Sequence, residues 1–250
     1  MNILLFNQSE LQDNQLTLND RRAEHIRKIL RAGCGDQLKT GQINGPLGRA
    51  TIREINKKRV ILQVELNVPL PPQPKTSMIL ALPRPIMLKR ILSQATTLGV
   101  SNIYLINSRR VEKSFFHASL LEENNMLPHL LHGLEQAGDT RLPKISIHQR
   151  FKPFVEDLLP EIGADSPARL VAHPEATSFL PELIEIPLQE KVLLAIGPEG
   201  GWIDYEIDKF KEQGFRPFTM GPRILRVDTA VISLLAQLDL LKSSRFKVLG

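Results

Sequence analysis

A proline-rich segment near residue 70 sets the strongest limit on how this chain can fold. Four of the six residues in 69–74 are proline, in the order Pro-Leu-Pro-Pro-Gln-Pro. Because proline lacks a backbone N–H and fixes φ, the segment can form neither a helix nor a central strand, and we expect a short semi-rigid spacer. At about 150 residues per domain, 250 residues suggest one large or two modest domains. The spacer therefore predicts two domains, comprising residues 1–72 and 73–250.

The positive charge of the chain is concentrated before this spacer. The chain has 32 Lys and Arg residues against 27 Asp and Glu, a formal charge of +5, and its 42% hydrophobic and 24% charged residues are typical of a globular protein. Residues 1–70 contain 11 basic and 7 acidic residues, a net +4, whereas residues 71–250 contain 21 and 20, a net +1. The excess favours a first domain that contacts a polyanion, although a solvated basic surface gives the same count.

Several classes of protein are disfavoured by what the sequence lacks. The single cysteine, Cys34, cannot form an internal disulfide, which fits a reducing compartment. The first residues lack the basic region and apolar run of a signal peptide, and no apolar run approaches the 18 residues of a membrane span. We therefore expect a cytoplasmic protein that does not contact a membrane. His129 and His132 could share a helix face, but without a partner carboxylate we expect no metal site.

The first domain is predicted to be a small β-barrel with one basic helix. Residues 20–30 read as a helix that begins at the capping residue Asp20 and ends before Gly33 and Gly35. Its predicted apolar face consists of Ala23, Ile26, Ile29 and Leu30. Short strands are predicted at residues 37–41, 48–55 and 59–66. Domains of this kind often present a helix and loops to RNA.

The second domain is predicted to be an α/β domain with a parallel sheet, because strands alternate with helices. The predicted strands are residues 77–82, 100–106, 144–147, 170–172, 192–196 and 216–220. The predicted helices are residues 86–98, 115–137 and 229–241, together with one that begins near Ile203. Pro128 is expected to interrupt the second of these helices, and Asp228 is placed to cap the last one.

Two loops of the second domain carry the pattern of a ligand site. Ligands of parallel sheets bind at the carboxyl ends of strands, and both loops directly follow predicted strands. The first loop, Ile196-Gly-Pro-Glu-Gly-Gly201, has three glycines that let a ligand lie on the backbone. The second loop, Met220-Gly-Pro-Arg-Ile-Leu-Arg226, offers Arg223 and Arg226 to a phosphate or a developing anion. Either loop alone is more often an ordinary strand-to-helix turn, but two in one stretch favour a site.

Other nucleotide and hydrolase motifs are missing. The sequence has no G-x-x-x-x-G-K-[ST] and no G-x-G-x-x-G at the start of a helix, which argues against a P-loop nucleotidase and against conventional dinucleotide binding. It also has no G-x-S-x-G nucleophile elbow.

The two loops, followed by Val227-Asp-Thr-Ala230, resemble the paired C-terminal motifs of the ribosomal RNA small subunit methyltransferase E family, which methylates uracil N3 of a uridine in 16S rRNA. The resemblance extends to Leu98-Gly-Val100, Glu135-Gln-Ala-Gly138, His173-Pro174 and the basic segment from His25 to Arg31. It covers essentially the whole chain.

This resemblance implies a PUA-like RNA-binding domain at residues 1–72, joined to a SPOUT methyltransferase domain at 73–250 whose C-terminal segment forms a trefoil knot. It also implies a homodimer that uses S-adenosylmethionine without a metal and acts on 16S rRNA or the small ribosomal subunit. The cofactor-binding residues implied are Val171, His173, Ile196, Gly197, Gly201, Met220, Gly221, Ile224 and Leu225.

The sequence departs from the family pattern at several polar positions. Ser93, Gln94 and Thr97 replace the usual Gln, Lys and Glu of the first helix of the second domain. Asp228 stands where the family commonly has Glu, and Glu175 where it commonly has Arg. The two glycine-containing loops are intact, so the methyltransferase assignment is better supported than the identity of the methylated nucleotide.

Methylation of uracil N3 requires a proton acceptor, because its N–H is only weakly acidic, comparable to a phenol of pKa about 10. Arg226 is the expected donor to a uracil oxygen or a phosphate. Glu199 or Asp228 is expected to accept the proton or to orient the acceptor. The alternatives are that Asp228 only caps a helix and that Glu199 only stabilises a turn.

The basic helix is expected to bind the phosphate backbone of RNA. The RNA-binding residues predicted are Arg21, Arg22, Arg27, Lys28, Arg31 and Arg223. Two other functions remain open at this stage: a SPOUT methyltransferase that acts on another RNA position, and a non-catalytic RNA-binding or assembly factor with the same fold.

Overall fold

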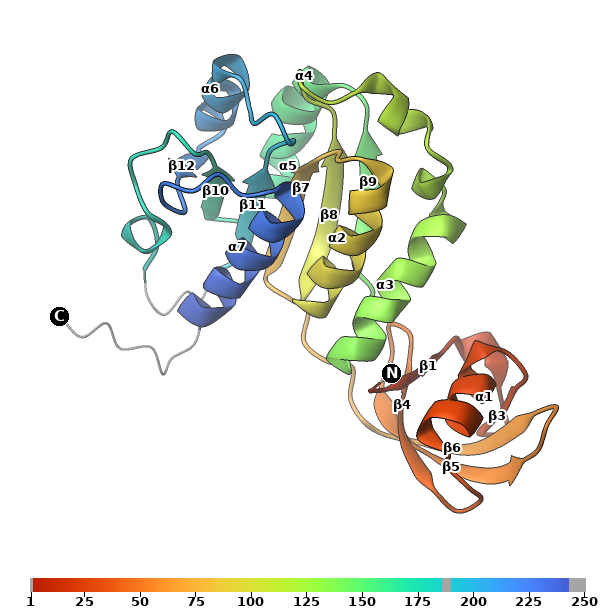
Figure 1. Cartoon of the computed structure of the whole chain (residues 1–250). Coiled ribbons are helices and arrows are strands. Elements are labelled where there is room, and N and C mark those ends of the chain that lie inside the picture. Colours follow the sequence, from red (N-terminus) through yellow and green to blue (C-terminus); the bar gives the residue numbers. More distant parts are fainter. Residues whose placement is uncertain (1, 186–189, 243–250) are drawn as a thin grey trace. The chain divides into compact units, whose positions relative to one another are not determined.

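The chain divides into two compact units in a computed structural model that describes residues 2–185 and 190–242 (Figure 1). The first unit comprises the described residues up to Gln73 together with Leu130–Leu142, and the second comprises Pro74–His129 and the described residues from Pro143 on. Assigning residues 130–142 to the second domain was therefore wrong. Leu134 is fully buried against Ile3 and Leu5, a contact between distant segments that local patterns do not reveal.

The first unit is built on one six-stranded sheet in the order β1-β4-β5-β6-β3-β2. Its strands are β1 (Leu4–Phe6), β2 (Leu11–Gln12), β3 (Gln15–Leu18), β4 (Gln37–Gln42), β5 (Leu47–Ile55) and β6 (Val60–Val68). β1 pairs parallel to β4, and the other pairs are antiparallel. The sequence predicted β4, β5 and β6 but missed β1 to β3, which are too short to show a clear alternation.

One helical segment covers the core of this sheet. A short 3₁₀ turn, η1 (Gln8–Glu10), precedes α1 (Arg21–His25), and α1 continues into a π-helical turn, η2 (Ile26–Leu30). Asp20 caps α1 as predicted, because its carboxylate accepts the N–H of Arg22 at 2.9 Å. The helix ends at Arg31, which adopts the left-handed conformation (φ 51°), and not at the predicted glycines.

The predicted apolar face of this helix is only half correct. Ala23 and Ile26 are buried, but Ile29 is 68% exposed and Leu30 is also exposed. A π-helical turn bonds residues five apart, so the positions that follow Ile26 are rotated away from the face that a regular α-helix would present.

Two arginines of this helix hold the first unit together. The Arg22 side chain is only 12% exposed, pairs with Asp20 at 2.8 Å and with Glu10, and donates to the carbonyl of Leu5 at 2.8 Å. Arg21 donates to both carboxylate oxygens of the buried Glu135, at 2.6 and 3.2 Å. The prediction that Arg22 binds RNA is therefore wrong, and the charge of Arg21 is neutralised.

The second unit has the predicted parallel sheet, in the order β12-β10-β11-β7-β8-β9. Its strands are β7 (Thr76–Ala81), β8 (Val100–Ile106), β9 (Lys144–His148), β10 (Ala168–Ala172), β11 (Val192–Ile196) and β12 (Arg216–Phe218). All neighbouring pairs are parallel, so the carboxyl ends of all six strands meet at one edge. The prediction of an α/β fold is confirmed.

Helices cover both faces of this sheet (Figure 1). The helices are α2 (Pro85–Thr97), the part of α3 (Glu123–Ala137) that precedes Leu130, α4 (Phe151–Pro153), α5 (Leu159–Gly163), α6 (Asp204–Glu212) and α7 (Val227–Lys242). The shorter turns are η3 (Lys113–His117), η4 (Ser119–Leu121), η5 (Phe154–Leu158) and η6 (Leu180–Glu182). α2 and α7 pack together on one face, and α4, η5 and α5 lie on the other. Among the described residues, no helix is long and apolar enough to cross a membrane.

Two predicted helix boundaries in this unit were wrong. α3 continues through Pro128, because a proline inside a helix removes one hydrogen bond without necessarily ending the helix. α7 begins at Val227, since the N–H of Ala230 already donates to the carbonyl of Arg226 at 2.8 Å. Asp228 therefore lies in the first turn and does not cap the helix, and its carboxylate accepts the N–H of Thr229 at 3.0 Å.

We predict that Arg22→Met lowers the free energy of unfolding by about 1–3 kcal/mol, because the carboxylates of Glu10 and Asp20 lose a largely buried donor. Lys28→Met is the matched control: Lys28 pairs with Glu24 on the surface, and its loss should cost less than about 0.5 kcal/mol. Urea denaturation followed by circular dichroism measures both variants, and equal costs would contradict the assignment.

Acidification should weaken the interaction between Arg22 and Glu10. Burial alone would raise the pKa of Glu10, but the hydrogen bonds from Arg22 and from the backbone of Asn7 hold it below its ordinary value. A carboxyl group whose pKa is lowered by folding stabilises the folded state at pH values above its ordinary pKa. This stabilisation is lost as the pH falls through the lowered pKa. The native chain should therefore lose stability more steeply on acidification than Arg22→Met.

Candidate functional site

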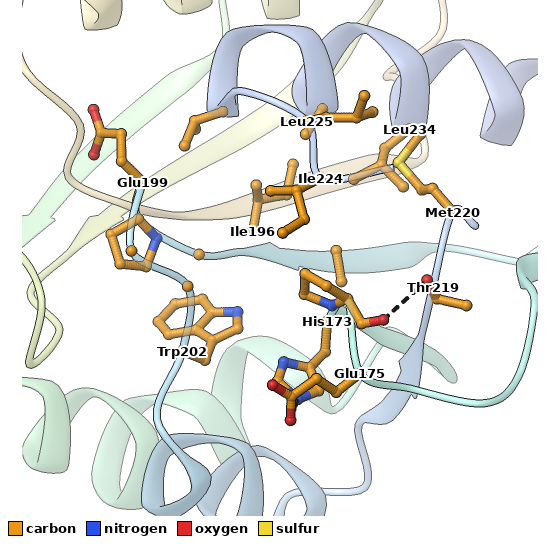
Figure 2. Close-up of a pocket in the computed structure, with 18 of the residues that line it drawn as sticks. His173, Glu175, Ile196, Glu199, Trp202, Thr219, Met220, Ile224, Leu225 and Leu234 are labelled. Atoms are coloured by element: carbon orange, nitrogen blue, oxygen red, sulfur yellow. Dashed lines mark hydrogen bonds and ion pairs between the residues drawn. The ribbon is translucent and has the colours of Figure 1, made fainter. Parts of the chain in front are cut away.

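A cavity of about 300 Å³ opens at the carboxyl edge of the parallel sheet, where β10, β11 and β12 end (Figure 2). Its walls are the segment after β10, the glycine loop at residues 197–201, the segment at residues 219–225 and the start of α7. The lining includes Ala172, His173, Ile196, Gly197, Glu199, Gly201, Trp202, Thr219, Met220, Gly221, Arg223, Ile224, Leu225, Ala230 and Leu234.

Two positions of the glycine loop favour glycine for a structural reason. Gly201 has φ +74°, a left-handed conformation that other residues rarely adopt. A Cβ atom on Gly197 would lie 3.1 Å from the indole nitrogen of Trp202. Gly197 therefore lets the indole ring of Trp202 pack directly against the backbone of the loop.

The segment after β12 is fastened to the segment after β10. The hydroxyl of Thr219 donates to the carbonyl of Pro174 at 3.3 Å, as Figure 2 shows, and it accepts the N–H of Gly221 at 3.2 Å. The backbone N–H of His173 donates to the carbonyl of Phe218 at 2.9 Å. These bonds join two walls of the cavity to each other.

The interior of the cavity is mostly apolar but contains two buried polar atoms without a partner. Ile196, Leu225 and Leu234 supply apolar surface. The indole Nε1 of Trp202 and the Nδ1 of His173 are buried and form no hydrogen bond within the described residues. Such a cavity suits a ligand with a large apolar body and a few polar groups.

The glycine loop is supported from behind by the loop that follows β8. Glu206 is 2% exposed, and its carboxylate accepts the N–H of Arg109 at 2.7 Å and the N–H of Ile203 at 3.0 Å. The guanidinium of Arg110 donates to the carbonyl of Gly200. This side chain thus lies against the glycine loop and lines the cavity.

Most of the residues predicted to bind a cofactor line this cavity. They are His173, Ile196, Gly197, Gly201, Met220, Gly221, Ile224 and Leu225. Val171 does not, because it lies inside β10 and is fully buried, and its neighbour Ala172 lines the wall in its place.

The predicted catalytic residues separate into two groups. Glu199 and the predicted RNA-binding residue Arg223 line the cavity. Arg226 and Asp228 lie outside it: the Arg226 side chain is 74% exposed, and its Nε is 3.8 Å from Asp228 Oδ1. The Asp228 side chain is 16% exposed.

Sequence reasoning missed Trp202, Thr219, Glu206 and Arg110. Trp202 directly follows the glycine loop and is the only tryptophan of the chain, a signal that could have been used. Arg110 comes from a distant loop, and no local pattern connects it to the site. The described residues contain no group of three or more His, Cys, Asp or Glu side chains that could hold a metal ion.

A family model described as an RNA methyltransferase domain matches residues 71–239. The ribosomal RNA small subunit methyltransferase E of Treponema pallidum is 34% identical over 94% of this chain and 90% of the relative. The ribosomal RNA small subunit methyltransferase E 1 of Borreliella burgdorferi is 27% identical over 93% and 95% of the two chains.

Solved structures share the fold. The ribosomal RNA small subunit methyltransferase E of Neisseria gonorrhoeae bound to S-adenosyl methionine has a TM-score of 0.75 at 19% identity, over 96% of this chain and 98% of the other. A Legionella pneumophila structure in complex with the bound cofactor SAM has a TM-score of 0.75 at 23% identity, over 96% and 97%.

We predict that Glu206→Gln loosens the glycine loop. The amide has one acceptor oxygen where the carboxylate has two, so the N–H of Arg109 or of Ile203 loses its partner at a cost of about 1–3 kcal/mol. Hydrogen exchange should speed up in residues 107–111 and 197–203. Glu212→Gln, at the exposed end of α6, should leave these segments unchanged, and equal exchange in both variants would contradict the role of Glu206.

Proposed function

Because the chain belongs to the ribosomal RNA small subunit methyltransferase E family, we propose that it transfers a methyl group from S-adenosylmethionine to uracil N3 of a uridine in 16S rRNA. The observation that carries the proposal is the cavity between the glycine loop and residues 219–225, with its apolar walls and two unpaired buried polar atoms.

The residues of the cavity fit S-adenosylmethionine. A Cβ on Gly221 would meet nothing within 4 Å, so the backbone there is open to a flat ring, and Ile196 and Leu225 offer apolar contacts. Trp202 and His173 offer hydrogen bonds from buried positions. When bound there, the cofactor supplies a methyl group activated by a sulfonium.

The roles of the charged residues follow from where they lie. Glu199 lines the cavity and is exposed, so it can accept the proton that leaves uracil N3. Arg226 is exposed at the start of α7 and can donate to a uracil oxygen or an adjacent phosphate. Asp228 orients Arg226, and Arg223 positions the RNA at the cavity. Alignment of the reacting atoms supplies the rest of the rate enhancement.

The proposal includes a C-terminal trefoil knot and a homodimer. β10 lies between β11 and β12, so the chain passes β10 on its way from β11 to β12 and again on its way to α7; this path supports a knot. Exposed apolar side chains on and beside the paired helices α2 and α7 support a second copy as partner. They are Ile86, Ile224, Ile232 and Leu240.

We further propose that the first unit is a PUA-like RNA-binding domain acting on ribosomal RNA in the cytoplasm. Arg27 donates to the carbonyl of Asn56 at 3.2 Å, which joins the start of η2 to the turn at residues 56–59. Among the described residues, no salt bridge involves Arg31, Lys57 or Lys58, and all three are exposed. With Arg27 and Lys28, these residues provide the positive charge that phosphates require.

Transfer of tritium from labelled S-adenosylmethionine tests the function. The substrates are 16S rRNA and small ribosomal subunits from a strain that lacks this activity, and nucleoside analysis identifies the product. We expect 3-methyluridine. A different methylated nucleoside would identify a methyltransferase of another RNA position, and no transfer despite cofactor binding would indicate a non-catalytic RNA-binding or assembly factor.

We predict that Arg226→Ala lowers kcat about 10²–10³-fold, the cost of losing one donor to a developing anion. The Kd for S-adenosylmethionine should not change, because Arg226 lies outside the cavity. Lys242→Ala, at the opposite end of α7, is the control. Full methylation by Arg226→Ala would contradict the role of this residue.

We predict that a triple variant weakens RNA binding; it carries Arg31→Ala, Lys57→Ala and Lys58→Ala. The plot of the logarithm of the RNA association constant against the logarithm of the salt concentration should become less steep by about 2–3, since each phosphate contact contributes roughly 0.7–0.9 to its slope. Lys152→Ala/Lys191→Ala/Lys211→Ala removes the same charge from paired lysines of the second unit and should leave the slope unchanged. Equal slopes for the two triple variants would contradict an RNA-binding surface on the first unit.

A further inference from the structure

Two buried polar atoms in one cavity lack hydrogen-bond partners among the described residues. They are the indole Nε1 of Trp202 and the Nδ1 of His173 (Figure 2). Folded proteins rarely leave buried donors or acceptors unpaired, because each costs about as much as a lost hydrogen bond. Their shared position on the wall of a cavity points to a ligand that pairs with both.

The direction of the Trp202 N–H is fixed by packing. The ring is 4% exposed and lies 5.1 Å from the ring of Phe210 and 6.4 Å from that of Phe151, measured between centroids. Its nitrogen lies 3.1 Å from where a Cβ of Gly197 would stand. The indole edge therefore packs against Gly197 at the wall of the cavity. Because indole is only a donor, a ligand that pairs with Nε1 must offer an acceptor.

The neighbours of His173 indicate that its Nδ1 accepts a hydrogen bond from the ligand, whereas Trp202 donates one. Its Nε2 lies 3.9 Å from a carboxylate oxygen of Glu175, which favours a proton on Nε2. Nδ1 then carries a lone pair and accepts a hydrogen bond. The ligand must therefore offer a donor as well as an acceptor.

We propose that Trp202 and His173 are the polar pair that positions the methyl donor, with Trp202 donating and His173 accepting. This inference rests on the proposed function. Both ends of S-adenosylmethionine carry the required chemistry: the adenine edge has an amino donor beside ring-nitrogen acceptors, and the amino-acid end has an ammonium beside a carboxylate. Neither residue then acts on the reacting atoms; both position the ligand.

Calorimetry with S-adenosylhomocysteine, which keeps both ends, tests the pair without measuring catalysis. Trp202→Phe keeps a ring and removes the N–H, and we expect its Kd to rise about tenfold or more. The melting temperature of the ligand-free variant, measured alongside, separates the loss of packing by the smaller ring from the loss of the hydrogen bond to the ligand. Tyr205→Phe, a ring outside the cavity, is the control and should bind like the native chain.

His173 is tested with a matched pair of variants. His173→Asn places an amide oxygen near the position of Nδ1 and should retain most of the affinity, whereas His173→Ala should lose about tenfold or more. 5′-Methylthioadenosine lacks the amino-acid end and locates the contact. Variants that weaken both ligands equally place the pair at the nucleoside end, and variants that weaken only S-adenosylhomocysteine place it at the amino-acid end.

The outcomes separate the inference from the proposed function. Trp202 is the only tryptophan, so its emission should change when the native chain is titrated with S-adenosylhomocysteine. No binding by the native chain would overturn the proposed function. Native binding with an unchanged Kd in Trp202→Phe and in His173→Ala would overturn this inference alone, and would assign both side chains to packing.

Discussion

The site depends on the place of β10 between β11 and β12. Because hydrogen-bonded neighbours in this sheet run parallel, the ends of these three strands meet at one edge, and the segments that follow them surround a single cavity. The chain must pass β10 to reach β12 and return to form α7, so residues 219–225 and the start of α7 supply two of the cavity walls. A different strand order would separate the two glycine-containing loops.

Around this cavity, the polar side chains that support the walls form hydrogen bonds with backbone groups. The polar atoms there that lack a partner in the described part of the chain are those that a ligand in the cavity can contact. Thr219 fastens one wall to another, and Glu206 satisfies two N–H groups at the start of α6. The walls are therefore preformed, and little ordering is needed on binding. Only at Trp202 and His173 does the cavity leave buried polar atoms without a partner among the described residues.

The predictions that succeeded were those based on local chemistry. The apolar runs of β7, β8 and β11 and the glycines at 197, 200 and 201 identified a parallel sheet and a loop at its carboxyl edge. The predictions that failed depended on neighbours distant in sequence. Arg22 looks like any basic residue of an exposed helix until Glu10 and Asp20 are seen to surround it. Ile29 was expected inside because a regular helix was assumed, and a π-helical turn places it outside.

By itself, the sequence determined the two-part organisation, the alternation of strands and helices, and the family to which the two C-terminal motifs belong, because proline, glycine and hydrophobic spacing act through the local backbone. The tertiary structure decided which charged side chains are available. It neutralised Arg21 with Glu135, placed Glu199 in the cavity and kept Arg226 outside it. Burial and ion pairing arise only when distant segments pack together, so no local pattern encodes them.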